Sequence, residues 1–197
     1  MVDCLHAAHY FICRAYENKR SDEMTNLKVQ KLLYYAQSLH LALFDEPLFP
    51  EEIQAWRYGP VCPPAYHFYS EFEGKPLPKP KKASFSDIDP YTIELLEEVG
   101  DYFRQYHACC LSGMTHVEFP WRKARKALPS DAKSTEPIEL ADMKLLGKEK
   151  LDEIERNHPD YEKILSHMLE EAFKDRNNSR IYVKEGEVDD WLNSLLA

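Results

Sequence analysis

The chain has 197 residues, five cysteines and a formal net charge of -9, and 44% of its residues are hydrophobic. This hydrophobic content is enough for a folded core and excludes global disorder, while no apolar run reaches the length of about 18 residues that suggests a membrane span. The negative charge disfavours general nucleic-acid binding, which needs concentrated Lys and Arg. The start of the chain lacks the pattern of a secretory leader, so we expect a cytoplasmic protein with reduced thiols.

Apolar residues at helical spacing predict two helices near the start of the chain. The first runs from Leu5 to Ala15, and the second covers Leu27 to Leu43, with Thr25 as its N-cap. One face of the second helix carries Val29, Leu32, Leu33 and Ala36. Gln30 and Tyr34 fall on an adjoining stripe, and Lys31 falls elsewhere on the cylinder.

A Gly-Pro loop follows, in the segment AWRYGPV at residues 55–61. Gly59 can adopt backbone angles closed to other residues, and Pro60 fixes its own φ, so the loop should be rigid. Trp56, Arg57 and Tyr58 are residue types enriched in binding hot spots. They fit two hypotheses equally well: they pin the loop onto the helical core, or they face a partner.

Further helices are predicted along the rest of the first three quarters of the chain. Pro63-Pro64 begins a short aromatic helix, and Asp89-Pro90 is an N-cap followed by Pro at the first helical position. Pro120-Trp121 opens a helix ending near Leu128, and Ile138–Leu146 is amphipathic. Between the second helix and the Gly-Pro loop, the pattern allows a short extended segment or one helical turn. The sequence predicts a mainly α fold, a compact multi-helix bundle with a Gly-Pro loop.

The composition changes after Gly147. Residues 145–197 carry 13 acidic and 8 basic residues, a net charge of -5 in about a quarter of the chain. Apolar stripes at 164–173 and 188–195 have helical spacing. We therefore predict a helical domain at residues 1–146 and an acidic helical extension at residues 147–197.

Two sets of residues are candidate metal ligands, but neither has the paired C-x-x-C spacing of structural zinc sites. The members are His6, His9 and Cys13 in one set, and His107, Cys109, Cys110 and His116 in the other. Small buried hydrophobic cysteines are the favoured interpretation. The sequence predicts no metal and no cofactor.

A hydrolase is the main enzymatic alternative, because Ser112, Thr115 and His116 are close in sequence. No G-x-S-x-G elbow accompanies them, so a structural role for His116 is favoured and no enzyme is predicted. The segment before Pro120 predicts a capped helix start, with Thr115 or Glu118 satisfying free amides and Trp121 packing inward. The basic run Arg122–Lys126 is the best candidate for a DNA contact.

Several blocks of the sequence resemble one known family when taken in order. They are NLKVQKLLYYAQ at 26–37, PLF at 47–49, AWRYGPV at 55–61, TH at 115–116 and PWR at 120–122. Together they resemble the Panacea domain of SocA-like and GepA-like antitoxins, which are often phage-associated, over about residues 5–146. The acidic tail has no counterpart in that pattern.

The resemblance implies a mostly helical, non-enzymatic domain that neutralises a toxin protein by direct binding. One member of the family delivers its toxin to a protease, so a bacterial AAA+ protease is a second implied partner. The positions that match the family pattern, or lie within its loop, are taken as partner-binding or shared-motif residues: Gln30, Lys31, Tyr34, Trp56, Arg57, Tyr58, Gly59, Pro60, Thr115, His116, Pro120 and Trp121.

We therefore predict an antitoxin-like protein that binds and neutralises a cognate toxin, with no membrane partner. The acidic charge suggests a basic toxin through charge complementarity. A small-molecule hydrolase using His116 and a DNA-binding autoregulator using the basic run stand as alternatives. Within the loop, Gly59-Pro60 is assigned to the scaffold, whereas Tyr58 and Tyr34 are candidate pocket residues.

Overall fold

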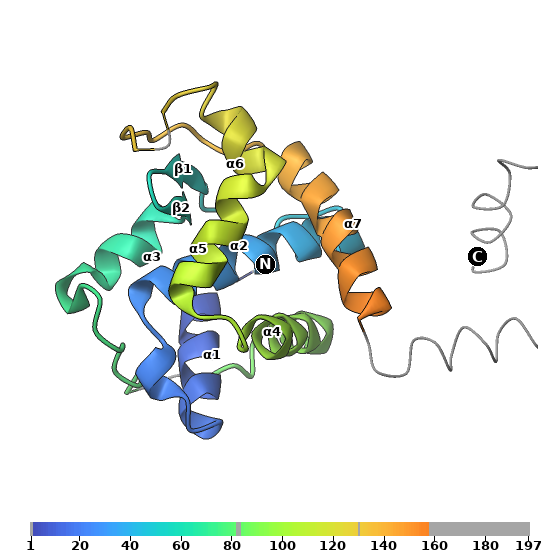
Figure 1. Cartoon of the computed structure of the whole chain (residues 1–197). Helices are drawn as coiled ribbons and strands as arrows, with labels where there is room; N and C mark the ends of the chain where they lie inside the picture. The colour runs from blue at the N-terminus through green and yellow to red at the C-terminus, as the bar shows by residue number, and fades with distance from the viewer. Residues whose placement is uncertain (1, 82–83, 130, 158–197) are drawn as a thin grey trace, which may run out of the picture. The chain divides into compact units, whose positions relative to one another are not determined.

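Helix α2 (Asn26–Phe44) is the central element of the unit formed by residues 1–154, and the other helices pack around it (Figure 1). The computed structural model describes residues 2–81, 84–129 and 131–157. Within this part, α2 contacts helices α1 (Cys4–Glu17), α3 (Pro63–Phe68), α4 (Pro90–Phe103) and α5 (Ala108–Val117). The predicted mainly α fold is confirmed.

Three helices begin at capping residues that satisfy free backbone amides. The side chain of Thr25 accepts a hydrogen bond from the Lys28 amide, as its N-cap position predicts. Asp89 accepts from the Thr92 amide at 2.9 Å ahead of Pro90, and this prediction is also confirmed. Asp3 caps α1 in the same way.

Helix α2 is buried on more than the one face that its apolar residues define. Lys28, Lys31 and Ser38, which lie off the predicted apolar face, are at most 2% exposed. The reason is tertiary, because α1, α3, α4, α5 and the hairpin surround this helix on several sides. Each buried polar group then needs a partner of its own.

The segment around the Gly-Pro loop is extended, which resolves the alternative left open by the sequence. Strands β1 (Gln54–Trp56) and β2 (Gly59–Val61) form an antiparallel hairpin with Arg57 and Tyr58 at its turn. On its other side, the Ala55 amide donates to the carbonyl of Glu136 at 2.8 Å. Strand β1 is therefore held between strand β2 on one side and the chain before α7 on the other.

Other boundaries differ from the prediction for local reasons. The aromatic segment after Pro63 divides into α3 and the 3-10 helix η2 (Ser70–Phe72), and a second 3-10 helix, η1 (Ser21–Glu23), precedes α2. Helix α6 (Phe119–Ala124) ends before Leu128, because Lys126 and Ala127 adopt φ values of 48° and 65°, outside the helical region.

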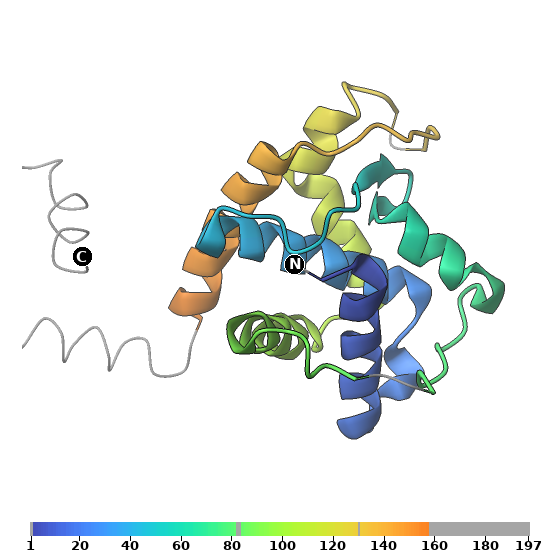
Figure 2. The same ribbon diagram turned by 180° about the vertical axis from the view of Figure 1, so that it is seen from behind.

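Helix α7 (Leu140–Arg156) begins later and ends later than predicted. Ile138 is extended, since its amide donates to the carbonyl of Ile53 at 2.8 Å. The helix then passes through Gly147, where a Cβ would lie 2.0 Å from the carbonyl oxygen of Ser38. Figure 2 shows α7 beside the end of α2. Gly147 thus permits a close approach of the two helices.

The predicted division at residues 146/147 stays a prediction, and helix α7 runs across it. The apolar stripes at 164–173 and 188–195 lie outside the described residues. No helix in the described ranges is both long enough and apolar enough to span a membrane.

Candidate functional site

The backbone of the β1–β2 hairpin is held by side chains that donate to its carbonyl oxygens. We call these side chains the hairpin cradle, and they come from α2, α5, α6 and the residue after α6. The bonds are Arg125 Nη1 to Ala55 O (3.2 Å), Trp121 Nε1 to Trp56 O (2.9 Å), His116 Nε2 to Arg57 O (2.9 Å), Ser112 Oγ to Tyr58 O (3.0 Å) and Lys31 Nζ to Pro60 O (3.0 Å). The cradle fixes the hairpin through its main chain, so the side chains at the turn are not needed to hold it.

Gly59 is required by its backbone angle and by its neighbours. Its φ is +98°, a conformation that other residues rarely adopt. A Cβ at this position would lie 2.5 Å from both Lys31 Nζ and Thr115 Oγ1. Thr115 is buried and its hydroxyl donates to the carbonyl of Ser112 at 2.8 Å. The structure thus brings Lys31, Gly59 and Thr115, which are far apart in sequence, to one point.

Gln30 links the end of the hairpin to helices α2 and α3. Its side-chain oxygen accepts from the Cys62 amide at 2.9 Å, and its nitrogen donates to Asn26 Oδ1 at 3.0 Å. Asn26 in turn donates to the carbonyl of Tyr66 at 3.0 Å. This chain of side-chain amides satisfies the buried Cys62 amide and the partly buried Tyr66 carbonyl.

A buried set of ionisable groups lies behind the cradle. Complete burial lowers the pKa of Lys31 to about 7, an effect that the charge of Glu118 opposes. Burial raises the pKa of Glu118 to about 7, against the nearby Lys150 cation and the Tyr35 hydroxyl, which donates to Glu118 Oε1 at 3.0 Å. Lys150 Nζ on α7 lies 3.5 Å from the same oxygen. Electrostatic interactions among these groups link α2, the residue before α6 and α7.

Tyr34 and Pro120 also belong to the interior and not to a surface. Tyr34 is fully buried, and burial, with the Glu118 charge, raises its pKa well above the ordinary value. It therefore does not line a pocket as proposed from the sequence. Trp121 is 5% exposed and packs inward, as predicted. The prediction that Glu118 caps the next helix through its side chain is wrong, because its carboxylate is directed to Tyr35 and Lys150.

The turn of the hairpin faces a groove with a volume of about 950 Å³. We call it the hairpin groove. Its lining includes Trp56, Arg57, Tyr58 and Gln30 from the predicted set. Tyr58 is 63% exposed and lies under the Arg57 guanidinium, which is 5.1 Å from the ring centroid. The other lining residues come from α2, β2, α3, η2 and the chain after it, α5 and the chain before α7: Asn26, Leu27, Val61, Tyr66, Ser70, Glu73, Gly74, Cys109, Ser112, Lys133, Ser134 and Thr135.

His116 is placed as a structural residue and not as a base. Its Nδ1 lies 2.5 Å from the carbonyl of Ser112 and its Nε2 lies 2.9 Å from that of Arg57. With both ring nitrogens directed at carbonyl oxygens, neither faces a substrate. The hydroxyl of Ser112 is likewise directed at the carbonyl of Tyr58. The geometry expected of a nucleophile beside its base is not formed by these residues.

The residues weighed as metal ligands do not form a ligand cluster. Within the described ranges, no group of three or more His, Cys, Asp or Glu side chains is arranged to hold an ion. Cys4, Cys13 and Cys62 are buried, so the predicted burial of Cys13 is confirmed. The predicted burial of Cys109 and Cys110 is wrong, because both are exposed on α5.

The basic run at 122–126 does not form one cationic face. Arg125 is 2% exposed, and its guanidinium donates to three backbone carbonyls, of Ala55, Pro129 and Ala132. Lys123 pairs with Asp142 at 2.7 Å, and Lys126 pairs with Glu136 at 3.2 Å. The assignment of Arg125 to a DNA contact is therefore wrong, because the residue braces the hairpin.

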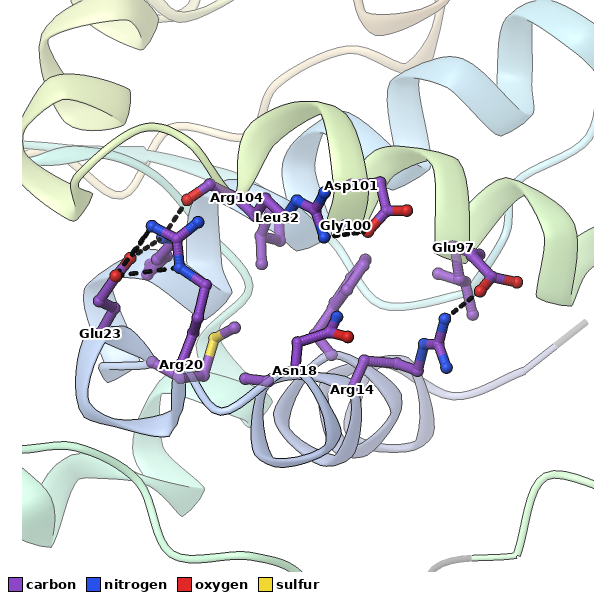
Figure 3. A pocket seen from close by; sticks show the side chains of 14 residues that line it. Arg14, Asn18, Arg20, Glu23, Leu32, Glu97, Gly100, Asp101 and Arg104 are labelled. Atoms are coloured by element: carbon purple, nitrogen blue, oxygen red, sulfur yellow. Dashed lines mark hydrogen bonds and ion pairs between the residues drawn. The ribbon is translucent and has the colours of Figure 1, made fainter.

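A second, smaller cavity of about 40 Å³ lies between α1, η1 and α4 (Figure 3). Its rim is made of charges that pair with one another, among them Arg14 with Glu97 and Arg104 with Asp101 at 3.3 Å. Lys28 donates to Glu23 at 3.3 Å and to the carbonyl of Arg104 at 3.1 Å. A space of this size holds a few water molecules, so we assign it to the packing of α1 on α4.

Reasoning from the sequence missed two parts of this arrangement. It did not identify Arg125 as a buried hydrogen-bond donor, because Arg in a basic run is normally solvated. It also did not place Tyr66 or the Lys133–Thr135 segment at the groove. A buried Lys31 signals a need for a nearby carboxylate, but only the fold identifies Glu118.

Comparison with known proteins gives one finding. The family model described as antitoxin SocA-like, Panacea domain, matches residues 29–122. The resemblance drawn from the sequence motifs is thereby confirmed, over a shorter span. The matched range covers most of α2, the hairpin, α3, η2, α4, α5 and part of α6. Searches of curated proteins and of solved structures found no match.

Proposed function

We propose, starting from the match of residues 29–122 to the antitoxin SocA-like Panacea domain, that this chain neutralises a toxin protein by binding it directly. The match supports an antitoxin role in general, and direct occlusion of the toxin is our specific proposal. The observation that carries the proposal is that the hairpin backbone is held by other side chains, which leaves the side chains at its turn exposed. The motif residues Lys31, His116 and Trp121 hold its backbone, while the exposed side chains of Arg57 and Tyr58 lie at the turn.

This arrangement suits binding without catalysis. Side chains that hold carbonyl oxygens keep the hairpin in place whatever residues occupy the turn. The turn can then present aromatic and cationic groups to a protein partner, where such groups contribute most of the binding energy. His116 and Ser112 are committed to the cradle, which argues against the hydrolase alternative.

Delivery of the bound toxin to an AAA+ protease is a further proposal within this role. It requires that the toxin and the protease be bound at the same time. Degradation of the toxin that depends on this chain and on the protease would support it.

The test is co-expression with the product of the small reading frame beside this chain's gene. We expect that product to stop growth when expressed alone, and this chain to restore growth and to co-purify with it. A double variant of the exposed control positions Arg122→Glu and Tyr91→Ala, both outside the groove, should neutralise as the wild type does. If wild-type chain neither restores growth nor binds that product, the proposal fails.

A further inference from the structure

We propose that the hairpin groove binds an acidic segment of the toxin that carries an aromatic or aliphatic anchor residue. This inference rests on the proposed function, because it names the part of the partner that the chain contacts. It goes further in giving the location of the contact and the chemistry of the segment recognised.

The anchor is inferred from the groove's walls. Trp56 and Tyr66 lie edge to face with ring centroids 4.9 Å apart, and both are partly exposed. Tyr58 adds a third ring, with 63% of its surface exposed. An opening of about 950 Å³ between aromatic walls can take one large apolar side chain with the backbone on either side of it. Aromatic rings held in fixed positions are the usual centre of a binding hot spot.

The acidic character of the segment is inferred from the groove's charges. Arg57 and Lys133 are both exposed and line the groove, while Glu73 is the carboxylate among the described lining residues. The groove is thus net positive on a chain whose formal charge is -9. Potentials across protein interfaces tend to be complementary, so a segment with carboxylates fits this groove better than one with Lys or Arg. Arg57 can also bind a carboxylate through two parallel hydrogen bonds.

The turn of the hairpin is held in place by hydrogen bonds to its backbone. The cradle bonds to Trp56 O, Arg57 O and Tyr58 O hold three successive carbonyl groups at the turn. A loop already fixed in its binding conformation loses less entropy when a partner arrives. The groove is therefore prepared to bind before the toxin is present.

The first experiment uses two short fluorescein-labelled peptides that differ only in charge. One alternates Asp with Leu and Phe, and the other has Lys in place of each Asp. We expect the full-length protein to bind the acidic peptide and not the basic one, and the variant Arg57→Glu/Lys133→Glu to reverse this preference. Tighter binding of the basic peptide by the wild type would overturn the inference.

Two exposed cysteines report where the peptide sits. Cys109 lines the groove and the adjacent Cys110 does not. In single variants Cys110→Ser and Cys109→Ser, a saturating acidic peptide should slow maleimide labelling of Cys109 several-fold and leave labelling of Cys110 nearly unchanged. Equal protection of the two thiols, or protection of neither, contradicts binding in the groove.

The second experiment uses the toxin itself. The Arg57→Glu/Lys133→Glu and Tyr58→Ala variants should each weaken toxin binding at least about tenfold, as hot-spot substitutions do. The matched controls Arg122→Glu and Tyr91→Ala should bind like the wild type, and all variants should melt at the wild-type temperature. If the groove variants retain full affinity, the inference is wrong while the proposed function stands. If the wild type binds no toxin, both are wrong.

Discussion

The indole Nε1–H of Trp121 donates to the carbonyl oxygen of Trp56 across 2.9 Å, although 65 residues separate the two tryptophans. Trp121 acts through its buried indole and Trp56 through its backbone carbonyl, while the Trp56 side chain lines the groove. This asymmetry predicts different outcomes for the same substitution at the two positions.

We expect Trp121→Phe to lower the free energy of unfolding by about 1–3 kcal/mol, because it leaves the partly buried Trp56 carbonyl without its donor. Trp56→Phe should cost less, since its indole donates to the partly exposed Gln54 side chain. Urea denaturation of the two variants checks this. If both variants lost the same free energy of unfolding, the different roles assigned to Trp121 and Trp56 would be contradicted.

Gly59→Ala should destabilise the fold by at least about 1–3 kcal/mol, the usual cost of forcing a residue into a sparsely populated backbone conformation. The new Cβ also meets Lys31 and Thr115 at 2.5 Å. Gly113→Ala is the matched control, because Gly113 lies in α5 with no atom within 4 Å of an added Cβ. That control should be neutral or stabilising, by up to about 1 kcal/mol. Thermal melts should show a lower melting temperature for Gly59→Ala and no decrease for Gly113→Ala.

The combined contribution of Lys31 and Glu118 to the free energy of unfolding should have its minimum near neutral pH. The Glu118 pKa is raised from 4.5 to about 7, so the folded state binds the extra proton and loses stability as pH rises through this range. The Lys31 pKa is lowered from 10.5 to about 7, so its contribution grows as pH rises from 7 to 10.5. At about 1.4 kcal/mol per pKa unit, the contribution is of the order of 3 kcal/mol for Glu118 and of the order of 5 kcal/mol for Lys31.

Variants separate the two limbs of that pH profile. Glu118→Gln should remove the decline on the acid side, and Lys31→Met should remove the rise on the alkaline side. The measurement is the free energy of unfolding against pH for the wild type and each variant. Profiles that run parallel to the wild type would show that neither group titrates as described.

Arg125→Met should destabilise the protein by about 3 kcal/mol or more, because three backbone carbonyls lose the buried guanidinium. Arg122→Glu, three positions earlier and exposed, should leave stability within about 0.5 kcal/mol. The alternative of a DNA-binding autoregulator can be tested by a gel shift on the DNA upstream of this chain's gene, and Arg122→Glu is the variant to use there. Any loss of binding with Arg125→Glu would reflect unfolding.

Gly147→Ala should loosen helix α7 from α2, since the added Cβ would lie 2.0 Å from the Ser38 carbonyl oxygen. We expect a loss of about 1–3 kcal/mol, as for overpacking in a tight core. Faster amide exchange in residues 140–154 than in α4 would locate the effect. Unchanged exchange in α7 would mean that the close approach at Gly147 is not needed.

Sequence alone determined the elements whose signals are local. Apolar spacing, the caps at Thr25 and Asp89, and the proline positions identified the helices, because a helix forms by contacts between neighbouring residues. The motif blocks also predicted the resemblance to the antitoxin SocA-like Panacea domain and drew attention to Gln30, Lys31, Gly59, His116 and Trp121. None of these signals required knowledge of long-range contacts.

Only the tertiary structure decided what those residues do. Lys31 looked like one polar position on a helix, yet packing on several sides of α2 buries it and directs its charge to the carbonyl of Pro60. Arg125 looked like part of a basic surface, yet it braces β1. Burial and hydrogen-bond partners depend on elements that are distant in sequence, and so no local pattern could separate the cradle from the groove that it supports.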